Sequence, residues 1–204
     1  MFNVFKFSIL LTVLMLFSAC SLSDFQKSKK EVIQLNNTLD NNIVDLSPYS
    51  AEFINQISNI RAKGLDCAPP ADALEPNLKL EEAAKAHAKD MAINHMVEHD
   101  GSGTVTDPAR KSEGIGSTFI DRIIFFGYPV RVHSLVGETL AHTKDVYVQS
   151  SDIKEHFKKA LDTIIKDEKQ CAILMNNRFK NIGIGAYKSK DGYYWAFDYA
   201  EAKE

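Results

Sequence analysis

The sequence lacks the features of a nucleic-acid-binding protein and of a serine hydrolase. No basic stripe with interleaved aromatic residues runs along the 204 residues, and the formal net charge is −3, with both signs interspersed. Attraction to a phosphate backbone therefore cannot dominate its interactions, and no nucleic-acid partner is expected. The chain also contains no GxSxG elbow and no other convincing nucleophile motif. Any enzymatic activity would have to rest on other groups.

Long apolar runs are also absent, apart from one near the start of the chain. Residues 7–17 form this run, which is too short to span a bilayer comfortably as a permanent helix. Lys6 precedes it as a positively charged n-region, and Ser18 and Ala19 are the small residues of a cleavage site. We therefore predict that residues 1–19 are an export signal and not part of the fold.

Cysteine is scarce, and one of the three cysteines follows this signal directly. Phe17-Ser18-Ala19-Cys20 resembles a bacterial lipoprotein signal, in which the cysteine becomes the lipidated first residue. The alternative is a plain signal peptide with an accidental cysteine. We expect lipidation at Cys20, because acyl chains stabilise membrane binding by about 0.8 kcal/mol per buried methylene. A serine after the lipidated cysteine, here Ser21, resembles the pattern of lipoproteins that are sent to an outer membrane. We therefore expect a lipid-anchored protein, attached to the outer membrane and facing the periplasm if the cell has an outer membrane.

The rest of the chain divides into a tether and one domain. Residues 20–48 are rich in Lys, Asn, Ser and Asp, which predicts a flexible tether behind the lipidated cysteine. Residues 49–204 are long enough for one domain with a hydrophobic core. In an oxidising compartment, the even pair left after lipidation of Cys20 predicts a disulfide between Cys67 and Cys171.

Helical periodicity runs through most of this domain. The central helix is predicted to begin near Leu78 and to end before Gly101, which places His99 in a Gly-rich turn. One stripe of this helix should face the core, namely Leu80, Ala83, Ala84, His87, Ala88 and Met91. Further helices are predicted at residues 53–63, 119–126 and 152–167.

Two strands are predicted to close the chain. Residues 181–187 and 193–199 flank residues 188–192, which have the composition of a hairpin loop. Trp195 and its alternate neighbours should face the core, and Asp198 should lie on the opposite face. Residues 134–141 are a short apolar segment that carries one carboxylate, Glu138.

Six segments carry a family resemblance. They are LEEAAKAHAKDMA, HDGSG, FIDRIIFFGY, VGETLA, CAILMNNRFKNIGIGAY and YYWAFDY, and they fall within Ser50 to Ala200. In this order they resemble the CAP superfamily, the cysteine-rich secretory, antigen 5 and pathogenesis-related proteins, and most closely its short bacterial members. The resemblance implies an α+β fold, an α-β-α sandwich with a small antiparallel sheet between helices and a cleft at one face.

The cleft of that family carries up to two histidines and two acidic residues, which are able to hold a divalent metal such as zinc. By position, His99 and Glu138 match one histidine and one acidic residue, and both side chains are ordinary zinc ligands. Gln170 stands where bacterial relatives carry histidine, and Asp167 falls on or near the second acidic position. Because glutamine is a poor zinc ligand, the resemblance implies a degenerate metal site at His99 and Glu138, with no cofactor or weakly bound zinc.

Plainer explanations of these residues stay open. His99 would also suit a helix C-terminus, where it interacts with the macrodipole. Glu138 would also serve only to satisfy buried polar partners. His87, in the middle of an apolar stripe, is predicted to be a packed and hydrogen-bonded core residue rather than a ligand.

Three functions are compatible with these features. We favour a lipid-anchored, non-enzymatic envelope protein whose cleft binds a small apolar molecule, a wall component or another protein. The second is a hydrolase in which His99 and Glu138 act as base and orienting group, or as metal ligands that activate water. The third is a purely structural envelope protein. No catalytic residue is assigned.

Overall fold

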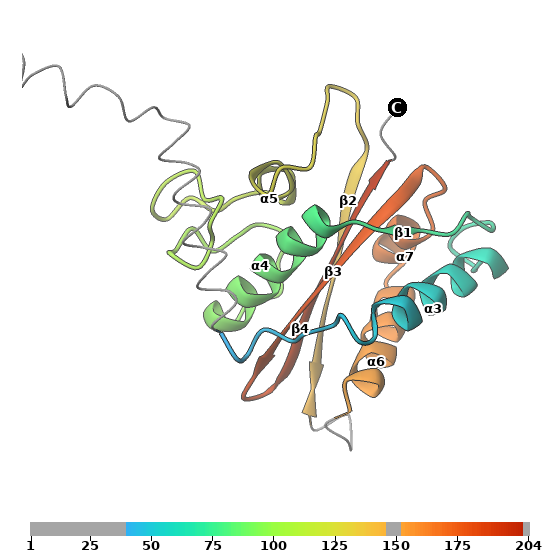
Figure 1. The fold of residues 1–204 in the computed structure, drawn as a ribbon, viewed down its shortest axis with the longest axis horizontal. Coiled ribbons are helices and arrows are strands. Elements are labelled where there is room, and N and C mark those ends of the chain that lie inside the picture. Colours follow the sequence, from blue (N-terminus) through green and yellow to red (C-terminus); the bar gives the residue numbers. More distant parts are fainter. Residues whose placement is uncertain (1–39, 146–151, 202–204) are drawn as a thin grey trace, which may run out of the picture. The chain divides into compact units, whose positions relative to one another are not determined.

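A four-stranded sheet lies between helices in the computed structural model, which describes residues 40–145 and 152–201 (Figure 1). The predicted signal peptide and Cys20 lie outside these residues. In chain order the elements are α3 (Ser50–Lys63), β1 (Glu75–Pro76), α4 (Leu78–Asn94), α5 (Phe119–Phe125), β2 (Val136–Lys144), α6 (Ile153–Lys166), α7 (Glu168–Leu174), β3 (Phe179–Ser189) and β4 (Gly192–Glu201). Within the described ranges, no helix has the length and apolar character needed to cross a membrane.

The strands lie in the order β1-β3-β4-β2. β3 and β4 form the predicted hairpin, and β2 pairs antiparallel with β4. The two residues of β1 pair parallel with β3, so the sheet is mixed, whereas the sequence predicted an antiparallel one. β2 was recognised only as an apolar segment, because Gly137 and Glu138 are weak strand formers that pairing with β4 holds in place.

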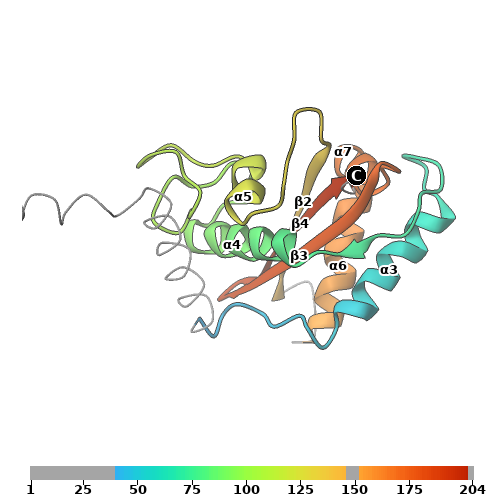
Figure 2. The same cartoon turned by 45° about the horizontal axis from the view of Figure 1, so that its top comes forward.

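The helices cover opposite faces of the sheet (Figure 2). α4 packs on β3 and β4 from one side, while α6 and α7 pack against β2. Trp195 and Phe197 are fully buried in the core cluster that also holds Phe53 of α3 and Phe157 of α6. Asp198 is buried as well and belongs to the other face, as the alternation predicted. The α-β-α sandwich is therefore confirmed.

Glycines allow α4 to approach the sheet closely. A Cβ atom on Gly183 would lie 2.1 Å from the backbone of α4 at Leu80, and one on Gly185 would lie 2.2 Å from that of Ala84. The predicted apolar stripe of α4 is fully buried, as expected. The helix begins at its cap, Asn77, whose side chain accepts hydrogen bonds from two backbone N–H groups of the first turn.

The end of α4 differs from the prediction. The helix stops at Asn94 because His95 adopts a left-handed conformation (φ 53°) and the N–H of Met96 bonds back to the carbonyl of Met91. His99 therefore lies beyond the helix, in the segment that leads into a loop. An interaction of His99 with the helix macrodipole is not its role, because that effect is confined to the last turn.

The folded unit begins at Asn42, earlier than the predicted boundary at residue 49. The N–H of Lys188 donates to the carbonyl of Asn42, and the N–H of Val44 donates to that of Ala186. Leu46 is buried in the core. Residues 42–46 belong to the fold because their backbone forms hydrogen bonds with the part of the outer edge of β3 that the short β1 does not cover.

A disulfide and a buried arginine hold α7 to the loop that follows α3. Cys67 and Cys171 form the predicted disulfide. Arg61 is fully buried, and its guanidinium donates to four backbone carbonyls, those of Asp72, Leu174, Asn176 and Phe179. Burial lowers the pKa of Arg61 from its usual value. Arg61 thus replaces water as the partner of carbonyls at the C-terminal end of α7.

Replacing Arg61 by methionine should destabilise the protein without changing its fold. The substitution preserves much of the aliphatic volume but leaves these buried carbonyls without donors, which should lower the free energy of unfolding by about 2–4 kcal/mol. Chemical denaturation monitored by circular dichroism measures this change. Lys63→Met, at an exposed position of the same helix, is the matched control and should change stability little. Equal stability of the two variants would show that the Arg61 contacts contribute nothing.

Candidate functional site

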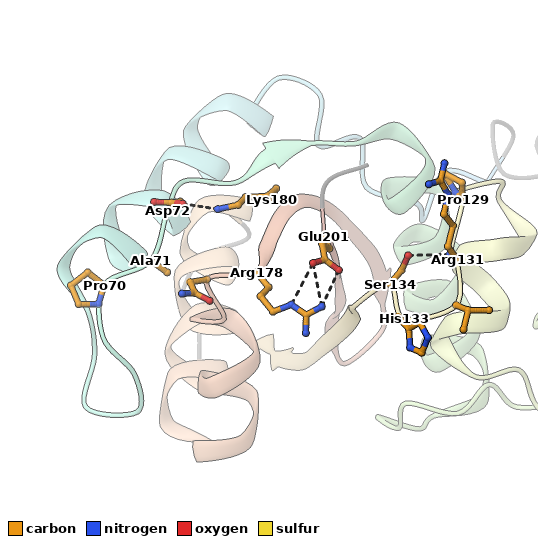
Figure 3. Close-up of a pocket in the computed structure, with 12 residues that line it drawn as sticks. Pro70, Ala71, Asp72, Pro129, Arg131, His133, Ser134, Arg178, Lys180 and Glu201 are labelled. Carbon is orange, nitrogen blue, oxygen red and sulfur yellow. Dashed lines mark hydrogen bonds and ion pairs between the residues drawn. The ribbon is translucent and has the colours of Figure 1, made fainter. Parts of the chain in front are cut away.

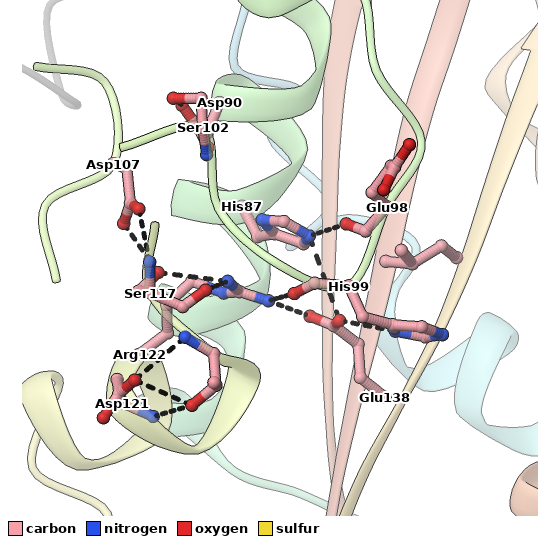
Figure 4. A network of polar contacts seen from close by, with 12 residues as sticks. His87, Asp90, Glu98, His99, Ser102, Asp107, Ser117, Asp121, Arg122 and Glu138 are labelled. Carbon is pink, nitrogen blue, oxygen red and sulfur yellow. Dashed lines mark hydrogen bonds and ion pairs between the residues drawn. The ribbon is translucent and has the colours of Figure 1, made fainter. Parts of the chain in front are cut away.

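His99 is presented by a loop that two buried carboxylates hold in shape (Figure 4). Asp90 of α4 accepts hydrogen bonds from the N–H and the hydroxyl of Ser102. Asp107 accepts from the N–H and the hydroxyl of Ser117 at the far end of the loop. The N–H of Gly101 then donates to the carbonyl of Ser117 at 2.7 Å, which closes the loop at its base. The sequence predicted an irregular polar loop but not these anchors.

Glu138 lies at the centre of the site. It is fully buried on β2, and its Oε1 accepts a hydrogen bond of 2.9 Å from Nδ1 of His99. Its Oε2 accepts one of 2.8 Å from Nη2 of Arg122. The structure therefore brings together His99 and Glu138, the two residues that were predicted as a pair.

Arg122 is the site residue that the sequence analysis missed. It lies on α5, is almost fully buried, and donates to the carbonyl of His99 at 2.8 Å and to that of Ser117 at 3.1 Å. α5 is short, and its start is fixed by a capping box between Thr118 and Asp121. The available signal was a single arginine among the apolar residues of FIDRIIFFGY, since a buried arginine requires a partner.

Two further buried groups surround Glu138. His87 is fully buried, and its Nε2 donates to the carbonyl of Glu98 at 2.8 Å, as predicted for a hydrogen-bonded core histidine. Burial lowers the pKa of His87. Asp198 of β4 lies opposite Glu138 in the strand register, and in the described part of the chain neither of its carboxyl oxygens has a hydrogen-bond partner. Burial, and then the charge of Glu138, raise the pKa of Asp198 well above its usual value.

The neighbours shift the pKa values of Glu138 and His99 in opposite directions. Burial alone would raise the pKa of Glu138, but the charge of Arg122 and the hydrogen bonds from His99 and Arg122 hold it below its usual value. The hydrogen bond to Glu138 raises the pKa of His99. Glu138 is therefore an anion at neutral pH, and it favours the protonated form of His99.

Asp167 and Gln170 have other partners. Asp167 is exposed and caps α7, where its Oδ1 accepts from the N–H of Gln170. The side-chain carbonyl of Gln170 accepts from the N–H of Leu140 on β2 at 2.6 Å. Over residues 40–145 and 152–201, no direct polar contact joins either residue to His99 or Glu138. Their predicted place in the cleft stays a prediction.

This donor set does not fit a resident zinc ion. Zinc sites use three or four protein ligands, and no group of three or more His, Cys, Asp or Glu side chains in the described ranges is arranged to hold a metal. Both oxygens of Glu138 are engaged, and the guanidinium of Arg122 already supplies positive charge beside them. Within the His99–Glu138 pair, the second ring nitrogen of His99 is the atom left open as a ligand.

Without a metal ion, the chemistry that these residues support is the exchange of a proton at His99. Its Nδ1–H is held by Glu138, and the half-exposed ring leaves Nε2 as an acceptor when neutral and a donor when protonated. The ring of Phe119 lies edge-on, 6.5 Å from that of His99. The nearby Ser117 hydroxyl donates to Asp107 instead, so it is not set up as a nucleophile.

An α-β-α sandwich with a histidine–glutamate pair at one end of its sheet defines the class of this protein. Residues 55–199 match the family model described as the cysteine-rich secretory protein family, or CAP. The chain belongs to the CAP family. No curated protein matched the sequence.

Two solved bacterial structures are similar to this chain. An outer surface protein from Borrelia burgdorferi is 17% identical, with a TM-score of 0.56 over 79% of this chain and 98% of its own. An extracellular protein containing an SCP domain from Bacillus anthracis is 19% identical, with a TM-score of 0.53 over 74% of this chain and 40% of its own. At these identities the likeness concerns the fold alone.

Removing the charge of Glu138 should lower the pKa of His99. In Glu138→Gln the His99 pKa should fall towards 6.5, its unperturbed value, because the anionic acceptor is lost. In the wild type, the raised pKa means that the pair stabilises the fold fully below pH 6.5, and this contribution is lost as the pH rises through the pKa of His99. NMR titration of the His99 ring protons measures the midpoint.

The control for this titration is Glu113→Gln, which removes an exposed carboxylate of the same loop. It should leave the His99 midpoint nearly unchanged, since charges in solvent are screened. A well-dispersed amide spectrum of Glu138→Gln verifies that the variant is folded. If its His99 midpoint equals that of the wild type, Glu138 does not control His99.

Proposed function

We propose that this chain is an exported, lipid-anchored CAP-domain protein of the cell envelope that binds a ligand at the surface around His99 and catalyses no reaction. The observation that carries this proposal is the full engagement of Glu138. Its carboxylate is shared between His99 and Arg122, so it is not available as a metal ligand or as a base. The half-exposed ring of His99 presents its Nε2 to solvent, while Glu138 and Arg122 behind it are buried.

The surroundings of His99 support a ligand with both polar and apolar parts. Phe119 of α5 lies beside the histidine ring, and α5 also exposes Ile120 and Ile124. Small-molecule sites in proteins combine an apolar lining with a few oriented polar groups. A small apolar molecule with one hydrogen-bonding group, an envelope component or an apolar patch of a partner protein would meet these requirements.

A hydrolase is the second candidate, and the His99–Glu138 hydrogen bond favours it. In that mechanism Glu138 holds the imidazole in place while Nε2 of His99 removes a proton from water. The same bond raises the pKa of His99, which favours the protonated ring and so reduces the fraction able to act as a base at neutral pH. The first proposal therefore accounts better for the electrostatics.

A zinc titration separates these alternatives from a metal-dependent enzyme. Calorimetry of residues 42–204 with zinc should detect no tight binding, since only one imidazole nitrogen is open. Gln170→His places a second imidazole beside β2 and should raise the affinity for zinc. Lys169→His, at the exposed neighbouring position, is the matched control and should not. Tight binding by the wild type that His99→Ala abolishes would contradict the conclusion that the site does not fit zinc, and zinc-dependent hydrolysis by the same protein would contradict the non-enzymatic proposal.

The anchor is tested by replacing Cys20. If Cys20 carries the lipid, the wild-type protein should be recovered with membranes and should incorporate a labelled fatty acid, because acyl chains supply the membrane affinity. Cys20→Ala should lose the label and leave the membrane fraction. Ser21→Ala, which keeps the cysteine, is the control and should still be labelled. Unlabelled wild-type protein would exclude the anchor.

A further inference from the structure

A hollow with a volume of about 820 Å³ is lined by residues other than His99 and Glu138 (Figure 3). Three segments distant in sequence form its walls, residues 70–72, 129–134 and 177–180, and Glu201 lies between them. Its volume falls within the range of about 300–1,000 Å³ that is typical of small-molecule sites. Neither the family resemblance nor the His99–Glu138 pair accounts for it.

Its lining carries an excess of positive charge. Lys180 pairs with Asp72 at 2.5 Å, and Arg178 pairs with Glu201 at 3.2 Å. Arg131 is a third cation, exposed on the opposite wall, and among the described residues its guanidinium has no ion-pair or hydrogen-bond partner. Two carboxylates therefore accompany three permanent cations in the lining of the hollow.

The wall that carries Arg131 is held in a fixed conformation. The N–H of Arg131 donates to the hydroxyl of Ser134, whose own N–H donates to the carbonyl of Arg131. Between them, His133 adopts a positive φ of 78°, which is unfavourable for a residue with a side chain. Such a conformation persists only where its surroundings impose it, and it often marks a functional segment.

The floor of the hollow is fixed to this wall. Glu201 accepts a hydrogen bond of 3.1 Å from the N–H of Leu135, which immediately follows the Arg131 turn. The buried Tyr128 donates its hydroxyl to the backbone carbonyl of Glu201 at 2.8 Å. Figure 3 shows Arg178 and Glu201 between the Asp72–Lys180 pair and the wall that carries Arg131. The backbone that carries Arg131 is therefore anchored, so its turn needs little rearrangement for binding.

We propose that this hollow binds a small molecule that carries a carboxylate or phosphate group. An arginine guanidinium matches both groups, because it donates two parallel hydrogen bonds to a pair of oxygens. Arg131 supplies an unused fork of this kind, and the amide of Asn177 supplies a further donor. Pro70, Pro129 and the exposed Val132 offer apolar contacts to the rest of the ligand. This site is independent of His99, so it does not rest on the function proposed above.

Two probes test the proposal on residues 42–204, which form a compact unit with the complete sheet and core. Inorganic pyrophosphate represents phosphate ligands, and D-glucuronate represents carboxylate ligands. At least one probe should shift the backbone amide resonances of residues 129–134 and 177–180 in a saturable manner. Arg131→Gln should weaken this binding about tenfold, as expected for loss of one charge-assisted contact. The tighter probe identifies which acidic group is preferred.

Lys190→Gln is the control, since it removes one positive charge from the exposed loop between β3 and β4. It should leave the affinity unchanged, whereas Arg178→Gln should also weaken binding. Unshifted amide resonances outside the hollow verify that each variant is folded. The proposal is overturned if neither probe binds, if the shifts map elsewhere, or if Lys190→Gln weakens binding as much as Arg131→Gln.

Discussion

The buried ion pair between Arg122 and Glu138 holds the His99 site together. It joins α5 to β2, and the same guanidinium binds the carbonyls of His99 and Ser117, which flank the loop. Burying two charges is costly, and losing one partner of such a pair typically destabilises a protein by about 3–5 kcal/mol because the other charge is left uncompensated. The position of His99 therefore depends on a residue that is itself hidden from solvent.

The same pair limits the chemistry of the site. A carboxylate already shared between a fixed guanidinium and an imidazole has little tendency to bind a metal ion as well, and Glu138 is held as an anion by its neighbours. The pKa of the neighbouring Asp198 is instead raised well above its usual value by burial and by the charge of Glu138, which favours the protonated carboxyl group there. The site thus places the buried carboxylate of Glu138 beside the half-exposed ring of His99.

Much of the fold could be predicted from periodicity. The buried stripe of α4 and the alternation at Trp195 and Asp198 follow from burial on one face of each element. The disulfide followed from the count of cysteines and the expected export. The strand β2 and the start of the folded unit at Asn42 were not predicted, because each depends on hydrogen bonds to segments distant in sequence. The end of α4 at Asn94 was not predicted either, because it depends on the left-handed conformation of His95.

The sequence by itself determined the helices, the closing hairpin, the disulfide and the partnership of His99 with Glu138, because these depend on local pattern or on family motifs. Only the tertiary structure decided what surrounds that partnership. In the sequence, Arg122 is one charged residue of a short predicted helix. It becomes part of the site because the packing of α5 brings the guanidinium of Arg122 into contact with Glu138. The hollow near Arg131 likewise arises from three distant segments, since a cavity is a property of packing and not of any one stretch of chain.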